Sequence, residues 1–169
     1  MTSKAKNGAY KILAAQKSAI TKIAGAIRPE AIDNLENEIG GIFTILKSTH
    51  FDEGQRYGYL ACVIPEEKYR LVIANRTWTY TAPINLGAYA ATALGVGISA
   101  AQQEQIVANH KDNQTSYTKY LGMQEARKEL ILYSVGDDAL APLKKQYINF
   151  ADATIHSMIK TSVRKQQSR

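Results

Sequence analysis

The chain of 169 residues has a single cysteine, and this scarcity excludes two classes of protein at once. Cys62 alone cannot form an internal disulfide framework or a cysteine-rich zinc module. It lies in the apolar run 59–64, so we expect a small buried hydrophobe there, which is compatible with a reducing compartment. The length suits one domain with a hydrophobic core rather than two.

Residue patterns for catalysis and metal binding are also lacking. The three histidines are not accompanied by a further pair of ligands at the spacing of a metal site. The chain also lacks the Gly-x-Ser-x-Gly motif that positions a nucleophilic serine. Residues 95–100 match a relaxed dinucleotide-binding pattern, but residues 88–93 do not read as the strand that must precede it. We therefore predict no catalytic residues, no cofactor and no metal, and a protein that is not an enzyme.

Large apolar side chains are sparse in the longest uncharged stretch. From Thr77 to Gln103 there are 27 uncharged residues, which is long enough for a membrane span. Pro83, Asn85, glycines and many alanines leave few residues to drive insertion. We therefore expect no membrane span, and either a flexible connector or a small-residue packing surface in this stretch.

Acidic residues are absent from both ends of the chain. The net charge is +6, and the segments 1–28 and 160–169 hold ten basic residues and no acid, so the section between them carries −4. Basic ends favour polyanions such as RNA through counterion release, although a solvated helix face and a frayed tail are an equally simple interpretation. Our candidate nucleic-acid contacts are Lys4, Lys6, Lys11, Lys17, Lys22, Arg28, Arg164, Lys165 and Arg169.

Hydrophobic periodicity predicts a mainly α-helical small domain. We divide the chain into a basic amphipathic helical arm (1–28), a single mainly helical domain (29–160) and a basic polar tail (161–169). Residues 42–46 and 57–64 suit strands or buried helix equally, which leaves a short β-hairpin within 42–64 open. The expected helices cover 12–27, 30–39 up to Gly40-Gly41, 65–73, and a long segment that begins after Ser99 and includes 117–133, followed by 138–147 and 152–164.

The stretch from Gln124 to Leu143 resembles a motif of copia-type retrotransposon Gag proteins. In both, a helix with a charged start and an apolar end runs into a short helix of the form Ser-Val-x-Asp-x-Leu-x-x-Leu, here from Ser134. A third helix follows, here 152–159, although the family usually has tryptophan near the position of His156. The resemblance covers about 45 residues of 117–164, and the 77–103 stretch has no counterpart. Its expected core is Leu130, Leu140, Leu143, Ile155 and Ile159.

This resemblance implies a capsid-like structural protein that self-associates into homo-oligomers and contacts RNA. With one cysteine it would be a truncated or repurposed Gag without a zinc knuckle. Tyrosine suits interfaces, and we expect interaction residues at Tyr117, Tyr120, Tyr133 and Tyr147. We predict a cytoplasmic protein. The alternative is an accessory subunit of a larger complex in an organelle, with residues 1–28 as a targeting segment.

Overall fold

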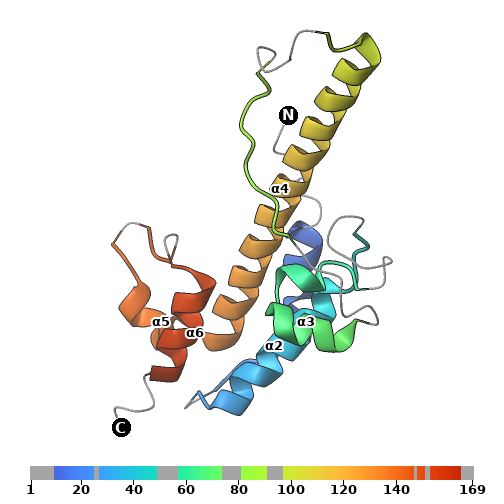
Figure 1. Cartoon of the computed structure of the whole chain (residues 1–169). Coiled ribbons are helices and arrows are strands. Elements are labelled where there is room, and N and C mark those ends of the chain that lie inside the picture. Colours follow the sequence, from blue (N-terminus) through green and yellow to red (C-terminus); the bar gives the residue numbers. More distant parts are fainter. Residues whose placement is uncertain are drawn as a thin grey trace.

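One long helix, α4 (Ala100–Val135), organises the fold (Figure 1). The computed structural model describes residues 10–24, 27–48, 57–73, 81–90, 97–146, 148–150 and 153–164. The C-terminal half of α4 contacts α2 and η3, and it also contacts α5 and α6. Figure 1 shows these two groups of helices on opposite sides of α4. The fold is therefore mainly α-helical, as the sequence predicts.

The ends of α4 follow from two residues. Ser99 caps its start: the Ser99 side chain accepts a hydrogen bond from the Gln102 backbone N–H, and the Gln102 side chain accepts one from the Ser99 backbone N–H. This capping box satisfies two donors that the first helical turn leaves without partners. At the other end, Gly136 has φ 77°, a backbone conformation that glycine adopts at low cost. The predicted helix start at Ser99 and the break at Gly136 are both confirmed.

The first group of helices precedes α4 in the chain. Residues 10–15 are α-helical and continue into η1 (Gln16–Ala19), after which the chain extends to residue 24. Helix α2 (Pro29–Phe43) starts at a proline, which suits a first helical turn. The short η3 (Leu60–Cys62) and α3 (Glu66–Val72) complete the group, and the predicted helix over 65–73 is confirmed.

Three predictions for this group are wrong. The helix predicted over 12–27 does not continue past Ala19: residues 20–24 are not helical, because the Ile23 backbone N–H donates to the Ser134 carbonyl of α4 rather than to a carbonyl one turn earlier.

Helix α2 does not end at Gly40-Gly41 but continues to Phe43. Gly40 is buried, and a Cβ added there would lie 3.1 Å from Leu60 Cδ1, so glycine serves close packing rather than helix termination. The described residues of 42–64, which are 42–48 and 57–64, contain no strand of a hairpin. Burial of Leu60, Ala61, Cys62 and Val63 explains their apolar run without a sheet.

The second group of helices follows α4: α5 (Asp137–Leu140), η5 (Ala141–Leu143) and α6 (Ile155–Arg164). The single helix predicted over 138–147 is wrong, because the α-helix ends at Leu140. Pro142 has no backbone N–H to donate to the carbonyl four residues earlier, and the chain turns into 3₁₀ geometry there. An isolated antiparallel bridge between Lys145 and Asn149 then reverses the chain toward α6.

The start of α6 is capped by two side chains. Thr154 Oγ1 accepts a hydrogen bond from the Ser157 backbone N–H (3.1 Å), and Ser157 Oγ accepts one from the Thr154 backbone N–H (3.0 Å). The pair occupies donors that the first helical turn leaves without partners. The predicted helix 152–164 is therefore present from Ile155 onward, and residue 152 lies outside the described residues.

Both groups of helices share one hydrophobic core. Leu13, Phe43, Leu130, Leu140 and Met158 have no exposed side-chain surface and belong to the same cluster. Of the predicted core residues, Leu130 and Leu140 are buried, and Leu143 and Ile159 pack against the cluster half-buried. The side chain of Ile155 lies outside the described part of the chain. Burial of Cys62 is confirmed.

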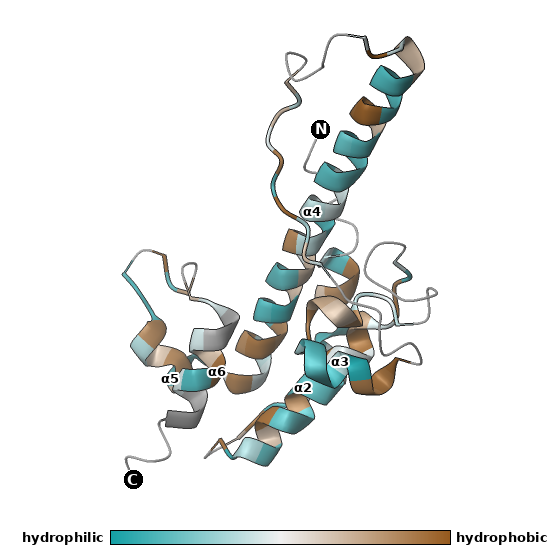
Figure 2. Ribbon diagram, in the orientation of Figure 1, coloured by the Kyte–Doolittle hydropathy of each residue, from teal (hydrophilic) through white to brown (hydrophobic). Residues whose placement is uncertain are grey.

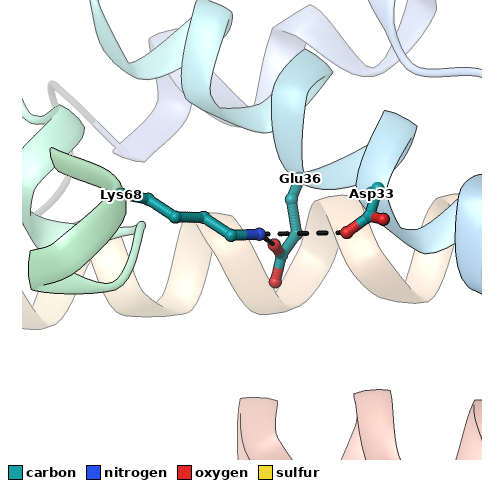
Figure 3. Close-up of polar contacts among 3 residues, drawn as sticks. All are labelled: Asp33, Glu36 and Lys68. Atoms are coloured by element: carbon teal, nitrogen blue, oxygen red, sulfur yellow. Dashed lines mark hydrogen bonds and ion pairs between the residues drawn. The ribbon is translucent and has the colours of Figure 1, made fainter. Parts of the chain in front are cut away.

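An acidic side chain joins α2, α3 and α4 electrostatically. Lys68 Nζ of α3 lies 2.8 Å from Glu36 Oε2 and 3.8 Å from Asp33 Oδ1 of α2 (Figure 3). The hydrogen bond with Glu36 raises the pKa of Lys68. Burial lowers the pKa of Arg127 on α4, and attraction to Glu36 opposes part of that effect. Glu36 therefore compensates part of the desolvation of the Arg127 charge on α4.

The two adjacent glycines of α2 give a direct test of its length. Gly41→Ala should raise the free energy of unfolding by about 0.5–1 kcal/mol, because alanine favours helix and its Cβ meets nothing within 4 Å. Gly40→Ala should gain less or lose stability, since its Cβ presses on Leu60. Urea unfolding of both variants measures the difference. A destabilising Gly41→Ala would mean that the helix ends before this residue.

Candidate assembly surfaces

The N-terminal part of α4 extends away from the rest of the fold. Every residue from 97 to 109 is exposed, and Figure 1 shows this part of the helix beyond both groups of helices. The residues 100–109 span about 15 Å of helix axis. A helix exposed on all sides gains little from packing, and short helices alone are marginal in water. Its continuity with the buried half of α4 supports it, and its whole circumference is available to another molecule.

An extended segment, 81–90, runs beside the middle of α4 (Figure 1). The backbone N–H of Leu86 donates to Gln114 Oε1 at 3.1 Å, and Gln114 Nε2 donates to Asn85 Oδ1 at 2.9 Å. Tyr89 packs its ring edge-to-face against His110, with centroids 5.4 Å apart. This part of the 77–103 stretch therefore lies along the helix through an amide side chain and an aromatic ring. Its glycine and alanines are exposed, so the small-residue packing surface stays a prediction. Segment 81–90 leaves the exposed start of α4 uncovered by described residues.

Exposed apolar side chains gather at the end of α3. Leu71 is 79% exposed and Val72 is 49% exposed, and the end of α3 is among the most hydrophobic parts of the ribbon in Figure 2. Tyr57 ties this end to the neighbouring turn by donating its hydroxyl hydrogen to the Val72 carbonyl at 3.2 Å. An exposed leucine side chain does not gain the stabilisation that full burial would give, which is about 1.5–3 kcal/mol for a whole side chain. Such an end favours contact with another molecule.

A groove lies between the C-terminal half of α4 and the turn before α6. Its walls combine apolar side chains with charged ones at the rim: Leu121, Gln124, Glu125, Lys128, Glu129, Leu132, Ile148, Asn149, Phe150, Ala153 and Thr154. Phe150 is buried and Ile148 is 43% exposed. The groove is formed by the segments that resemble the Gag motif together with the turn that links them.

The basic N-terminal segment packs against α4 over its described residues. Lys17 Nζ lies 2.9 Å from Glu129 Oε2, and the hydroxyl of Tyr10 donates to the same carboxylate. Lys22 Nζ lies 4.6 Å from the centre of the Tyr133 ring, a cation–π arrangement. Two of the candidate nucleic-acid contacts, Lys17 and Lys22, are therefore engaged with α4.

Two backbone-mediated contacts reinforce this packing. The Ile23 backbone N–H donates to the Ser134 carbonyl at 2.9 Å, and Ser134 Oγ donates to the Thr21 carbonyl at 2.7 Å. This pairing is not predictable from the sequence, because hydrophobic periodicity gives the apolar face of the segment but not the partners of its lysines. The only sequence signal for a partner of Lys17 is the acidic residue Glu129. This signal is weak, because α4 carries several other charges of both signs.

The remaining candidate nucleic-acid contacts divide into two sets. Lys11 and Arg28 are exposed, and neither forms an ion pair with another described residue. Lys4, Lys6, Lys165 and Arg169 lie outside the described residues, and so does the side chain of Arg164. Among the described residues of the N-terminal segment, Lys11, Lys22 and Arg28 are exposed, and Lys22 also lies over the Tyr133 ring.

Three of the four predicted interaction tyrosines, Tyr117, Tyr120 and Tyr133, lie on α4 and are half-buried. Tyr120 and Tyr133 pack against the core, and burial raises the pKa of Tyr120. Tyr117 is half-buried on the same helix, and Tyr147 lies outside the described residues. Tyr120 and Tyr133 therefore serve packing within the chain, and Tyr133 also binds Lys22.

Comparison with known proteins gives no relative. No protein-family model matches the chain, and no curated protein or solved structure matches it. Within the described residues, no cluster of histidine, cysteine and acidic side chains could hold a metal ion. None of the described helices combines the length and the apolar character that crossing a membrane requires.

The Lys17–Glu129 contact predicts an acid-dependent loss of stability. The hydrogen bond from Lys17 lowers the pKa of Glu129 from 4.5, so the folded state favours the ionised carboxylate. This contribution is complete above the unfolded carboxyl pKa and is lost as the pH falls through the lowered folded value. Glu129→Gln should melt at a lower temperature than the wild type at pH 7 and equally at pH 2.

Circular dichroism melts of both proteins at the two pH values measure this effect. Glu104→Gln is the matched control, because Glu104 lies on the same helix and forms no ion pair with another described residue. It should leave stability nearly unchanged at both values. A difference for Glu129→Gln that persists at pH 2 would show that packing, rather than charge, accounts for its effect.

Proposed function

We propose that this chain is a non-enzymatic, capsid-like assembly protein that self-associates and contacts RNA through its basic ends. The observation that carries the proposal is the exposed start of α4, residues 100–109, which projects from a well-packed core. A projecting helix contributes little to the stability of one copy, and it suits contacts between molecules. The exposed Leu71 and Val72 at the end of α3 support the same function.

The helices that resemble the Gag motif also support the proposal. The C-terminal half of α4 contacts α5 and α6, and Leu130, Leu140 and Met158 lie in the shared core without exposed surface. The motif thus corresponds to one packed unit rather than to separate helices. In the proposed function this unit is the rigid body that presents the projecting helix.

Contact with RNA is assigned to exposed basic residues near the two ends of the chain that form no ion pair with another described residue. Lys11, Arg28 and Lys160 are such residues. Lys17 faces Glu129, and Lys22 is exposed but also lies over the Tyr133 ring. Binding through a few such charges is non-specific and weakens steeply with salt. We therefore propose weak, sequence-independent contact with RNA, reinforced by the number of copies in an assembly.

The second candidate function is an accessory subunit of a larger complex. Its organellar form requires removal of residues 1–28 as a targeting segment. Leu13, Ile20 and Ile27 are 0–5% exposed in the shared core, so removal would take three buried side chains from it. This burial favours a segment that stays with the folded protein. It supports the cytoplasmic form of the proposal over the organellar one.

Size-exclusion chromatography coupled to light scattering tests the proposal. The mass should grow with protein concentration, and addition of RNA at 50 mM salt should produce larger species that shrink at 300 mM salt, because phosphate contacts are screened. A mass that equals one copy at every concentration, with or without RNA, would contradict it. That outcome would favour a subunit that requires a different protein partner.

A core substitution tests whether the N-terminal segment belongs to the fold. Leu13→Ala should lower the free energy of unfolding by about 2–4 kcal/mol, because it leaves a cavity where a side chain has no exposed surface. The neighbouring Ile12→Ala is the control, since Ile12 is 46% exposed and should lose much less. Equal, small losses for both variants in urea unfolding would show that the segment is dispensable and revive the targeting interpretation.

A further inference from the structure

One face of the projecting part of α4 has a regular pattern. Residues 100, 104, 107, 108 and 111 are spaced by three and four, which places them on one side of a helix. All of them are exposed, and Val107 is 41% exposed. The first four of these residues, with Gln103, line a shallow hollow over two alanines. This set, Ala100, Glu104, Val107, Ala108 and Lys111, is called the α4 face below.

The charges of the α4 face stand at its two sides. Glu104 and Lys111 are seven residues apart, which separates them by about 10 Å along the helix axis. This distance prevents an ion pair within the helix. Neither residue forms an ion pair with another described residue. The face thus presents one negative and one positive charge, with Val107 and Ala108 midway between them.

We propose that the α4 face docks a second copy of this chain by antiparallel pairing of the two helices. A two-fold axis between positions 107 and 108 places Glu104 of each copy opposite Lys111 of the other. The same operation places Val107 opposite Ala108, a larger side chain against a smaller one. Charge and shape are therefore both self-complementary about a single axis. This inference rests on the proposed function and specifies the surface that it uses.

The dimensions of the α4 face predict a weak contact. Alanine at position 108 allows the helix axes to approach to the usual 8–10 Å. About three turns of each helix meet, which buries well under the ~1,000 Å² of a stable specific interface. One such contact alone is transient. A two-fold contact occupies the α4 face of both copies, so a larger assembly requires a second kind of contact. Copies held near one another by such a contact, or by a shared RNA, raise the effective concentration for this pairing.

Charge reversal tests the pairing directly in the full chain. Glu104→Lys places two lysines opposite each other at both ends of the face, and Lys111→Glu places two glutamates there. Each single variant should weaken self-association about tenfold or more at 50 mM salt, since attraction becomes like-charge repulsion. The difference should shrink at 500 mM salt. Sedimentation velocity over a concentration series measures the association constant.

Two further samples separate pairing from net charge. The double variant Glu104→Lys/Lys111→Glu has the wild-type net charge and should regain wild-type association. An equimolar mixture of the two single variants should also associate, because each lysine pair of one meets the glutamate pair of the other. Circular dichroism melts should be alike for all variants, since both positions are exposed. Failure of both the double variant and the mixture to recover would overturn the antiparallel pairing.

The wild-type series distinguishes the failure of this inference from that of the proposed function. A wild type that associates, with single variants that associate equally well, would show that copies meet elsewhere, and the end of α3 would be the next surface to examine. In that case the proposed self-association is supported, and the α4 face is not the surface that forms it. A wild type that stays monomeric at the highest concentration overturns both.

Discussion

Burial of the C-terminal half of α4 is the constraint on which the rest of the structure depends. Met123, Ala126 and Leu130 are at most 1% exposed, and helices from both ends of the chain pack against this half. Two of the buried residues of this half, Gly122 and Ala126, are small, and small buried side chains let neighbouring elements pack closely against a helix. Because both groups of helices share this support, loss of either would expose apolar surface of α4 to water.

The same helix separates two roles along its length. Its C-terminal half packs in the hydrophobic core. Its exposed start makes no contribution to that core, but the continuous helix fixes the direction in which this start projects. Segment 81–90 extends the rigid part by bonding to Gln114 and packing on His110. The result is a projecting helix of defined orientation, which suits repeated contacts between identical copies better than a flexible segment would.

Local signals in the sequence predicted those parts of the fold that depend on neighbouring residues alone. Ser99 and Gly136 set the ends of α4, and Pro29 starts α2, because caps and turns act within a few residues. Long-range packing decided the rest. The sequence predicts a helix end at Gly40, but in the structure a Cβ at Gly40 would press on Leu60. The sequence likewise predicts a nucleic-acid contact at Lys17, but Lys17 pairs with Glu129, which is 112 residues away in the chain. For the α4 face, spacing gives the side of the helix, whereas its exposure needed the structure.

Weak pairing and RNA contact support each other under the proposed function. The α4 face is too small to hold two copies together alone, and Lys11, Arg28 and Lys160 are too few to hold RNA tightly. An RNA that binds several copies raises their local concentration, and paired copies present more positive charge to one RNA. Each weak contact then increases the population of the other. Because Glu129 already neutralises Lys17 within the fold, this coupling acts through the remaining exposed charges and leaves the packing of the N-terminal segment undisturbed.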